Sequence, residues 1–220
     1  MLEFADYQPG LETQQLICQV DFAAIMGPTA SGKSSLILEV QQLGLADIHL
    51  VPTNTSRELR PGERPGIDVI PSTEAEMRRR IAAGEYAQVA PRTFGGIYAT
   101  APENYRTGKL CVMPVIFEAL PAFQALPFNS LLPVYVMPPS GEEWNRRIIK
   151  HNFTAPEAEK RMAEARRSLA FAATHELAFV IADQLETAVQ EFTAVLHGQT
   201  PQLSVNEGQA HARYLLSQLT

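Results

Sequence analysis

The chain has 220 residues, 45% of them hydrophobic and 19% charged, with a formal net charge of -6 at pH 7. This length suits one α/β domain with an inserted subdomain, and the hydrophobic share is enough for a full core. The first twenty residues carry acidic residues and no Lys or Arg, which argues against a basic signal peptide. No apolar run reaches the roughly 20 residues that a membrane-spanning helix needs. We therefore expect a soluble, cytoplasmic protein.

The charges are unevenly distributed along the chain. All Lys and Arg residues except Arg213 lie between Lys33 and Arg167, where acidic residues nearly balance them. Nucleic-acid binding usually needs a surplus of basic residues, so a local basic site for a small anionic ligand is the better interpretation. The only cysteines, Cys18 and Cys111, are far apart in sequence. We expect two buried thiols rather than a disulfide, and no zinc site.

A glycine-rich motif follows the first apolar run, at residues 22–26. Its residues, Gly27-Pro28-Thr29-Ala30-Ser31-Gly32-Lys33-Ser34, match G-x-x-x-x-G-K-[ST] at every fixed position. Residues 34–40 predict a helix, so strand, loop and helix come in the order of a phosphate-binding loop. There, backbone N–H groups and the helix N-terminus bind phosphates, Lys33 reaches the β and γ groups, and the Ser34 hydroxyl ligates Mg²⁺. The motif predicts an ATP site; the alternative is a turn with a solvated lysine.

The next part of the chain is predicted to be irregular at first and β-rich later. Residues 49–52 predict a short strand, whereas residues 53–66 are too rich in Pro, Gly and Arg for regular structure. A helix is expected from Thr73, where Thr-x-x-Glu has capping-box spacing, to Gly84. Residues 85–100 predict a β-rich excursion with a turn at Pro91 to Gly96.

The second half alternates apolar runs with helical patterns, which is typical of a parallel α/β sheet. Ser140 and Thr154 each begin a segment with capping-box spacing. We expect strands at residues 110–116, 131–137 and 178–182, and helices at 141–150, 154–174, 185–196 and 213–219, the last two joined by a polar linker at 198–208.

Two arginines in the irregular segment predict a second anion site. Arg57 and Arg60 are three residues apart in a loop stiffened by Pro61, so both guanidinium groups could bind one phosphate, each with two hydrogen bonds. The alternative is a solvated type II turn at Pro61-Gly62. The glycine loop favours the anion site, because a phosphoryl acceptor requires a second phosphate position.

The motifs after the glycine loop resemble those of the guanylate kinase family. Residues 55–63, Thr-Ser-Arg-Glu-Leu-Arg-Pro-Gly-Glu, are similar to that family's acceptor-phosphate loop, T-[ST]-R-x-x-R-x-G-E. Further matches are Gly66-Ile67-Asp68, Ala83-Gly84-Glu85, Ile97-Tyr98-Ala99-Thr100, Pro138-Pro139-Ser140-x-Glu142 and Lys160-Arg161-Met162. The glycine loop also looks like that of tRNA prenyltransferases, but the acidic and glutamine motifs of those enzymes are absent. The resemblance covers roughly residues 20–195.

The resemblance implies a single domain with a P-loop three-layer α/β fold. A parallel sheet would be flanked by helices and carry an inserted β-rich acceptor-binding subdomain and a helical lid. The implied boundaries are a core at about 18–52 and 101–197, an insertion at about 53–100, a lid at about 146–162 and a C-terminal extension at 198–220. No function is predicted for residues 1–17 or 198–220.

The resemblance also implies residues for each half of the site. Lys33, Arg147 and Arg161 would neutralise charge on the transferred phosphoryl group. The implied ATP-phosphate residues are Gly27, Pro28, Thr29, Ala30, Ser31, Gly32, Lys33, Ser34 and Ser35, with Ser34 on Mg²⁺. The implied acceptor residues are Thr53, Arg57, Arg60, Gln88, Tyr98 and Thr100. Thr100 has an alternative role, because Thr100-Ala101-Pro102-Glu103 also has capping-box spacing.

Other basic residues are assigned to solvated helix faces. Arg166 and Arg167 are expected to pair with Glu157, Glu159 or Glu164. Arg78, Arg79 and Arg80 are expected on the surface of their own helix.

Several positions depart from the family pattern. The family's Asp-x-Asp acids are replaced by Pro114 and Ile116, its guanine-reading Glu by Gln88, a Tyr by Val69, and an Asn near the ATP base by Ala182. Pro114 and Ile116 accept no side-chain hydrogen bond, and Gln88 offers a donor and an acceptor but no negative charge. Strict guanine selection is therefore not expected.

Two classes of function remain open at this point. The first is a Mg²⁺-dependent kinase that moves the γ-phosphoryl group of ATP to a nucleoside monophosphate, or to a sugar phosphate as in ribose bisphosphate kinases. The second is a non-catalytic nucleotide-binding, regulatory or scaffold module with the same fold. The complete glycine loop favours the enzyme, because such scaffold domains generally have degenerate loops. Neither a nucleic acid nor a membrane is an expected partner, and the oligomeric state is not predicted.

Overall fold

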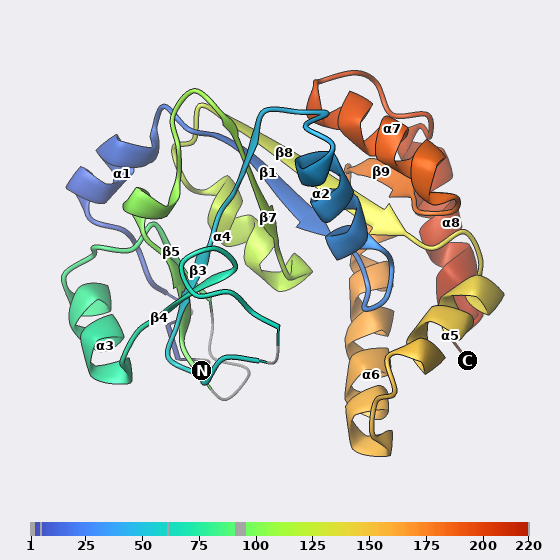
Figure 1. Ribbon diagram of the computed structural model, residues 1–220, viewed down its shortest axis with the longest axis horizontal. Helices are drawn as coiled ribbons and strands as arrows, with labels where there is room; N and C mark the ends of the chain where they lie inside the picture. The colour runs from blue at the N-terminus through green and yellow to red at the C-terminus, as the bar shows by residue number, and fades with distance from the viewer. Residues whose placement is uncertain (1–2, 5, 61, 91–95, 220) are drawn as a thin grey trace. The chain divides into compact units, whose positions relative to one another are not determined.

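The computed structural model describes residues 3–4, 6–60, 62–90 and 96–219. The fold is mixed α/β, with a sheet of strand order β2-β7-β1-β8-β9 and a second sheet of order β4-β3-β6-β5. Among the described residues, no helix is long and apolar enough to cross a membrane. The elements in chain order are α1 (Leu11–Ile17), β1 (Asp21–Met26), α2 (Lys33–Gln42), β2 (Ile48–Leu50), β3 (Thr53–Thr55), β4 (Val69–Pro71), α3 (Glu74–Ala82), β5 (Gln88–Val89), β6 (Tyr98–Thr100), η1 (Pro102–Asn104), β7 (Leu110–Pro114), η2 (Phe117–Ala119), α4 (Leu120–Gln124), β8 (Ser130–Met137), α5 (Gly141–Lys150), α6 (Ala155–Ala172), β9 (Ala178–Ile181), α7 (Leu185–Leu196) and α8 (Val205–Ser217) (Figure 1).

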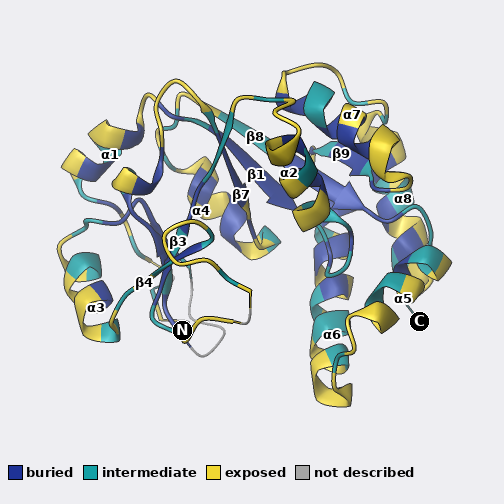
Figure 2. Ribbon diagram, viewed as in Figure 1, coloured by how far each residue is buried: buried dark blue, intermediate teal, exposed yellow. Residues whose placement is uncertain are grey.

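The chain divides into two compact units. Unit 1 contains residues 1–23, 48–113 and 118–131, and unit 2 contains residues 24–47, 114–117 and 132–220. In unit 1, β2 pairs in parallel with β7. In unit 2, β8 pairs in parallel with β9, which contacts both α7 and α8, and α6 also contacts α8. Figure 2 shows β1 as largely buried; β8 is buried over its last four residues, and Phe179 of β9 has no exposed surface. The parallel sheet and its flanking helices agree with the predicted fold class.

The second sheet lies in unit 1 and corrects one prediction. Residues 53–55 form a strand instead of irregular structure, because β3 pairs in parallel with β4 and antiparallel with β6. Two β-branched threonines suit this position. Strand β5 completes the sheet by antiparallel pairing with β6. Pro61 and most of the predicted turn, residues 91–95, lie outside the described residues.

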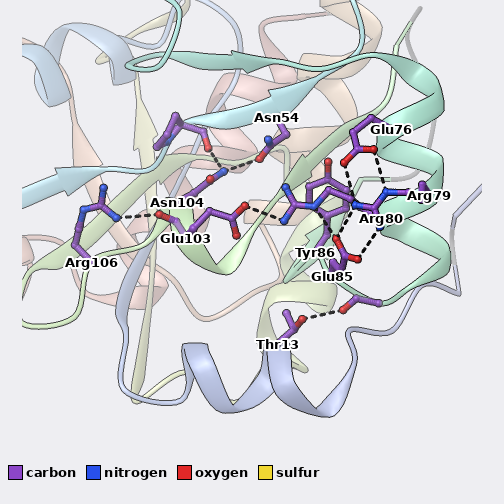
Figure 3. A network of polar contacts seen from close by, with 12 residues as sticks. Thr13, Asn54, Glu76, Arg79, Arg80, Glu85, Tyr86, Glu103, Asn104 and Arg106 are labelled. Carbon is purple, nitrogen blue, oxygen red and sulfur yellow. Dashed lines mark hydrogen bonds and ion pairs between the residues drawn. The ribbon is translucent and has the colours of Figure 1, made fainter.

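A polar network fastens α3 and η1 to this sheet (Figure 3). Arg80 on α3 bonds to Glu103 of η1 at 2.8 Å and to Glu85 at 3.2 Å. Asn104 of η1 donates from Nδ2 to Asn54 Oδ1 of β3 at 2.7 Å. Only 18% of the Arg80 side chain is exposed, so it is more buried than the expected surface position.

The N-terminal segment contains a helix that the sequence patterns did not indicate. Thr13 of α1 donates from Oγ1 to the Gly84 carbonyl at 2.8 Å, and the Gly10 N–H donates to the same oxygen at 2.9 Å. Gly84 has φ +69°, which favours glycine, and an added Cβ would lie 2.8 Å from the Gly10 nitrogen. Residues 10–13 therefore hydrogen-bond to the turn that follows the C-terminal end of α3.

Two further expectations need correction. Cys18 is exposed at the end of α1, whereas Cys111 is buried as expected, and both thiols are free. The last helix begins at Val205 instead of Arg213, because Ser204 and Glu207 form a capping box. Gly208, assigned to the linker, lies inside α8, where an added Cβ would overlap the ring of Phe179.

Candidate functional site

The glycine loop between β1 and α2 has the backbone that the motif predicts. Gly27 and Gly32 have φ values of +143° and +106°, and Ala30 adopts a left-handed conformation at +58°. An added Cβ at Gly27 would overlap the carbonyl group of Val136. Glycine is therefore required there for both conformation and space. Gly32 is the N-cap of α2, so the loop ends at the positive end of this helix.

Lys33 folds back over the loop. Its Nζ donates to the carbonyl oxygens of Gly27 at 2.7 Å and Pro28 at 2.8 Å, and to Ser31 Oγ at 3.3 Å. Desolvation lowers the pKa of Lys33 to about 8, with the charge of Glu164 opposing and that of Arg161 adding to the decrease. A negatively charged ligand at this position would favour the protonated form of Lys33.

A cavity of about 390 Å³ adjoins the loop, which is within the size range of small-molecule sites. Its lining combines the N-terminal turn of α2, the basic end of α5 and the segment from β9 into α7. The lining residues are Ala30, Ser31, Gly32, Lys33, Ser34, Ser35, Leu36, Arg147, Lys150, His151, Ala182, Asp183, Leu185 and Ala188. Most of the predicted ATP-phosphate residues therefore border one cavity.

Arg147 is directed toward the loop by an acidic neighbour that the motif analysis did not single out. Glu143 Oε1 accepts from Arg147 Nε at 2.7 Å, and the two Nη groups of Arg147 approach the carbonyls of Ser31 and Asp183 at 3.4 Å each. Hydrogen bonds from Arg146 and Arg147 lower the pKa of Glu143 to about 2. The i,i+4 spacing of Glu143 and Arg147 was the available sequence signal.

Trp144 supports the loop from α5 and was also missed. Its Nε1–H donates to the Thr29 carbonyl at 2.8 Å, and the residue is only 1% exposed. Buried tryptophans usually pair this N–H. A single apolar residue on an amphipathic helix gives no signal for such a contact.

Arg161 lies on α6 close enough to Lys33 for its charge to affect the lysine pKa. Its guanidinium lies 5.1 Å from the ring centre of Phe153. Arg166, predicted to pair with a glutamate, donates instead to the Leu219 carbonyl at 2.6 and 3.1 Å. Arg147 therefore contacts the loop through the Ser31 carbonyl, while Arg166 binds the C-terminal residues.

The predicted acceptor residues gather on one face of the second sheet. The strand registers pair Thr55 with Tyr98, and Gln88 with Thr100. Because side chains alternate along a strand, these four residues and Thr53 share a face. Val89 and Ala99 lie on the other face, in an apolar cluster with Met77, Tyr86, Ile97 and Ala101.

Arg57 is held at this face by Tyr98, the Glu63 carboxylate and the Glu58 carbonyl, which accepts from Nη1 at 2.6 Å. Its Nε donates to Tyr98 Oη at 2.9 Å, and Glu63 accepts from Nη1 at 2.8 Å and from Nη2 at 2.5 Å. Glu63 also accepts from the Arg60 N–H at 2.8 Å. The hydrogen bond from Arg57 lowers the pKa of Glu63. In this structure Arg57 therefore makes its two parallel hydrogen bonds to Glu63, a carboxylate of its own loop. The sequence analysis did not assign this role to Glu63.

The remaining acceptor residues differ in their surroundings. Arg60 is exposed, whereas Gln88 and Thr100 are 5% and 1% exposed. Thr100 accepts a hydrogen bond from Tyr105 Oη at 2.9 Å. Its alternative role as a helix cap is wrong, because Ala101 occupies the N-cap of η1.

The residues present fit Mg²⁺ only as a partner of bound phosphate. Ser34 lies exposed in the first turn of α2, and the described chain contains no group of three acidic, His or Cys side chains suited to a metal. Pro114 and Ile116 supply no side-chain oxygen. Mg²⁺ commonly takes one or two protein ligands, with phosphate oxygens and waters completing its shell. The Ser34 hydroxyl fits such a site.

Comparison with known proteins gives consistent matches. The family model described as guanylate kinase matches residues 21–199. A guanylate kinase of Bdellovibrio bacteriovorus is 27% identical over 176 residues, covering 78% of this chain and 94% of its own length. One of Thermotoga maritima is 28% identical over 189 residues, covering 83% and 89%. The crystal structure of guanylate kinase from Anaplasma phagocytophilum aligns with TM-score 0.59 and 18% identity, covering 85% of this chain and 88% of that one, which supports the fold.

Proposed function

Because the chain belongs to the guanylate kinase family, we propose that it transfers the γ-phosphoryl group of ATP to a nucleoside monophosphate. The observation that carries this proposal is the glycine loop with Lys33 beside a cavity of about 390 Å³. The protein is a phosphotransferase of guanylate kinase type. The scaffold and sugar-phosphate alternatives are not favoured, since the similar proteins are guanylate kinases and the match covers most of their length.

The donor nucleotide would bind in unit 2. The backbone from Gly27 to Ser34 and the N-terminus of α2 would bind its phosphates. Lys33 would exchange the carbonyl groups that it now contacts for phosphate oxygens, and Glu143 would hold Arg147 toward the same loop. When bound at Ser34, Mg²⁺ would neutralise phosphate charge and help to orient the donor.

The acceptor would bind on the polar face of the second sheet in unit 1. Tyr98 and Arg57 offer hydroxyl and guanidinium donors to its phosphate, and Arg60 adds a second guanidinium from the same loop. Thr53, Gln88 and Thr100 complete the proposed set. Arg57 is already oriented by Glu63, so little side-chain freedom is lost when the phosphate binds.

The chemical step needs position and charge more than covalent help. In phosphoryl transfer the attacking and leaving oxygens lie in line, and charge on the moving group must be neutralised. We assign this neutralisation to Lys33, Arg147 and Arg161. Lys33, with a pKa near 8, gains its full charge as phosphate approaches.

Acceptor-dependent ADP release tests the proposal. ATP and Mg²⁺ are supplied with GMP, dGMP, AMP, CMP, UMP or ribose 1,5-bisphosphate in turn. We expect turnover with at least one nucleoside monophosphate, its loss in Lys33→Ala, and its retention in Lys109→Ala, which removes an exposed lysine before β7. Absence of acceptor-dependent ADP release with every compound, or full activity in Lys33→Ala, would contradict the proposal.

A further inference from the structure

Helix α8, the last element of unit 2, has no role in the proposed function so far. It lies beyond residue 199, where the match to the family model ends. Arg213 donates from Nη1 to the carbonyl of Ala173, the C-cap of α6, at 2.9 Å. Gln209 donates from Nε2 to the His175 carbonyl at 3.2 Å. These two hydrogen bonds hold α8 against the end of α6.

A further contact joins α8 to the start of α5. His211 Nε2 lies 2.9 Å from the Pro138 carbonyl oxygen, which can only accept, so this nitrogen carries the donated proton. Pro138 directly follows β8, and Ser140 is the N-cap of α5. Gly141 continues the contact, because an added Cβ there would lie 2.9 Å from the Cβ of Gln218 at the end of α8. The first residues of α5 therefore lie against α8.

Helix α5 carries two of the side chains that contact the glycine loop. Trp144 donates to the Thr29 carbonyl at 2.8 Å, and Arg147 approaches the Ser31 carbonyl at 3.4 Å. The Trp144 N–H also donates to the carbonyl of Ser140 at 3.0 Å, so the indole lies one turn from the N-cap. Because backbone hydrogen bonds join each turn of a helix to the next, a shift at the N-cap would move both side chains relative to the loop.

We propose that His211 is a positioning residue of the ATP site: through its hydrogen bond to Pro138 it fixes the start of α5 against α8. Trp144 and Arg147 are thereby held against the glycine loop. The identity of the ligand, ATP, rests on the proposed function above, whereas the contact between the two helices does not. His211 acts through α5 and makes no contact with the nucleotide in this account, so its loss should weaken ATP binding without removing any group that touches ATP.

Two amide variants separate this hydrogen bond from other roles of the imidazole. His211→Gln places an amide N–H near the position of Nε2, whereas His211→Asn is one CH₂ shorter and does not reach the Pro138 carbonyl. The Kd for ATP with Mg²⁺ should increase by about 3- to 10-fold in His211→Asn, as expected for one lost hydrogen bond, and stay within about 2-fold of wild type in His211→Gln. The acceptor KM should not change in either variant, because the proposed acceptor residues belong to unit 1.

Trp144 supplies a readout that does not require catalysis. It is the only tryptophan of the chain, and it is 1% exposed. If α5 shifts away from the loop, the indole gains contact with water, so its emission should move to longer wavelength and acrylamide should quench it more strongly. His211→Asn should show both changes, and His211→Gln should show neither.

Arg213→Met is the structural control, because it removes the hydrogen bond of the same helix to the end of α6 and keeps a long flexible side chain. The experiment measures the ATP Kd by calorimetry, Trp144 emission and quenching, and the thermal unfolding midpoint in wild type and the three variants. The control should lower the midpoint and leave the ATP Kd and the emission as in wild type.

Weaker ATP binding and a more exposed Trp144 in His211→Asn, both restored in His211→Gln, support the inference. A lower unfolding midpoint in His211→Asn with unchanged ATP Kd and emission overturns it, because that is the pattern of a purely structural residue. Equal changes of ATP Kd and emission in Arg213→Met also overturn it. Absence of acceptor-dependent ADP release in wild type overturns the proposed function instead, and ATP binding and Trp144 emission still decide the role of His211.

Discussion

The pair formed by Arg57 and Glu63 should contribute measurably to both stability and acceptor binding. Their side chains are 15% and 20% exposed, and two hydrogen bonds join them. Hydrogen bonds to charged groups contribute about 1.5–3 kcal/mol when buried, and exposed ion pairs about 0.2–1 kcal/mol. For this partly buried pair, Glu63→Gln should lower the free energy of unfolding by about 1–2 kcal/mol, or the melting temperature by roughly 2–8 °C.

The pH dependence makes this prediction specific. Arg57 lowers the pKa of Glu63 in the folded state, so the stabilisation is complete above the ordinary carboxyl pKa and is lost as pH falls through the folded-state value. Denaturant unfolding should therefore separate wild type from Glu63→Gln near neutral pH and bring them together once the pH falls below the lowered pKa of Glu63. Glu58→Gln, a change at an exposed neighbour, serves as the control.

Acceptor kinetics provide a second readout for the same variant. Without the carboxylate, Arg57 is held only by Tyr98 and the Glu58 carbonyl. The acceptor KM should increase several-fold while the ATP KM is unchanged. Equal stabilities of wild type and Glu63→Gln near neutral pH, or a difference that persists undiminished at low pH, would refute this account.

Three further variants test unit 2. Trp144→Phe removes the hydrogen bond to Thr29 and should lower the unfolding free energy by about 1 kcal/mol and raise the ATP KM; unchanged values of both would contradict the supporting role. Glu143→Gln should also raise the ATP KM. Because the Glu143 pKa is depressed to about 2, its charge persists through the ordinary carboxyl range, so the ratio of variant to wild-type KM should be constant from about pH 4 to 8. Gly208→Ala places a methyl group against Phe179, and overpacking of about 1–3 kcal/mol should outweigh the gain of about 1 kcal/mol in helix propensity. Denaturant unfolding should show a net loss of stability, and a gain would refute the packing argument.

The sequence predicted the glycine loop and the strand and helix beside it because their determinants are local. Gly27 and Gly32 are required by positive φ values within one loop, and the apolar runs before and after that loop indicate strand and helix directly. The helices capped by Thr73 and Ser140 were predicted for the same reason. Each cap hydroxyl accepts from a backbone N–H only three residues later in the chain.

The predictions that failed depend on contacts between distant segments. Thr53 to Thr55 form a strand only because β4 and β6 lie on either side of them, and residues 10–13 are ordered against Gly84. Gly208 looked like a linker residue because its reason for being glycine, the ring of Phe179, is 29 positions away in the chain. Composition carries no information about such partners.

The two halves of the proposed site differ in how strongly they depend on particular side chains. Backbone groups form most of the donor site, so many side chains at positions such as Thr29 should be compatible with ATP binding. The proposed acceptor site depends on side-chain pairs, in which Glu63 holds Arg57 within one loop and Tyr105 donates to the hydroxyl of Thr100. Substitutions within such pairs are coupled, so removing Arg57 and Glu63 together should cost less than the sum of the single changes. Acceptor preference can therefore change through partners that never contact the nucleotide, while the donor loop keeps its sequence.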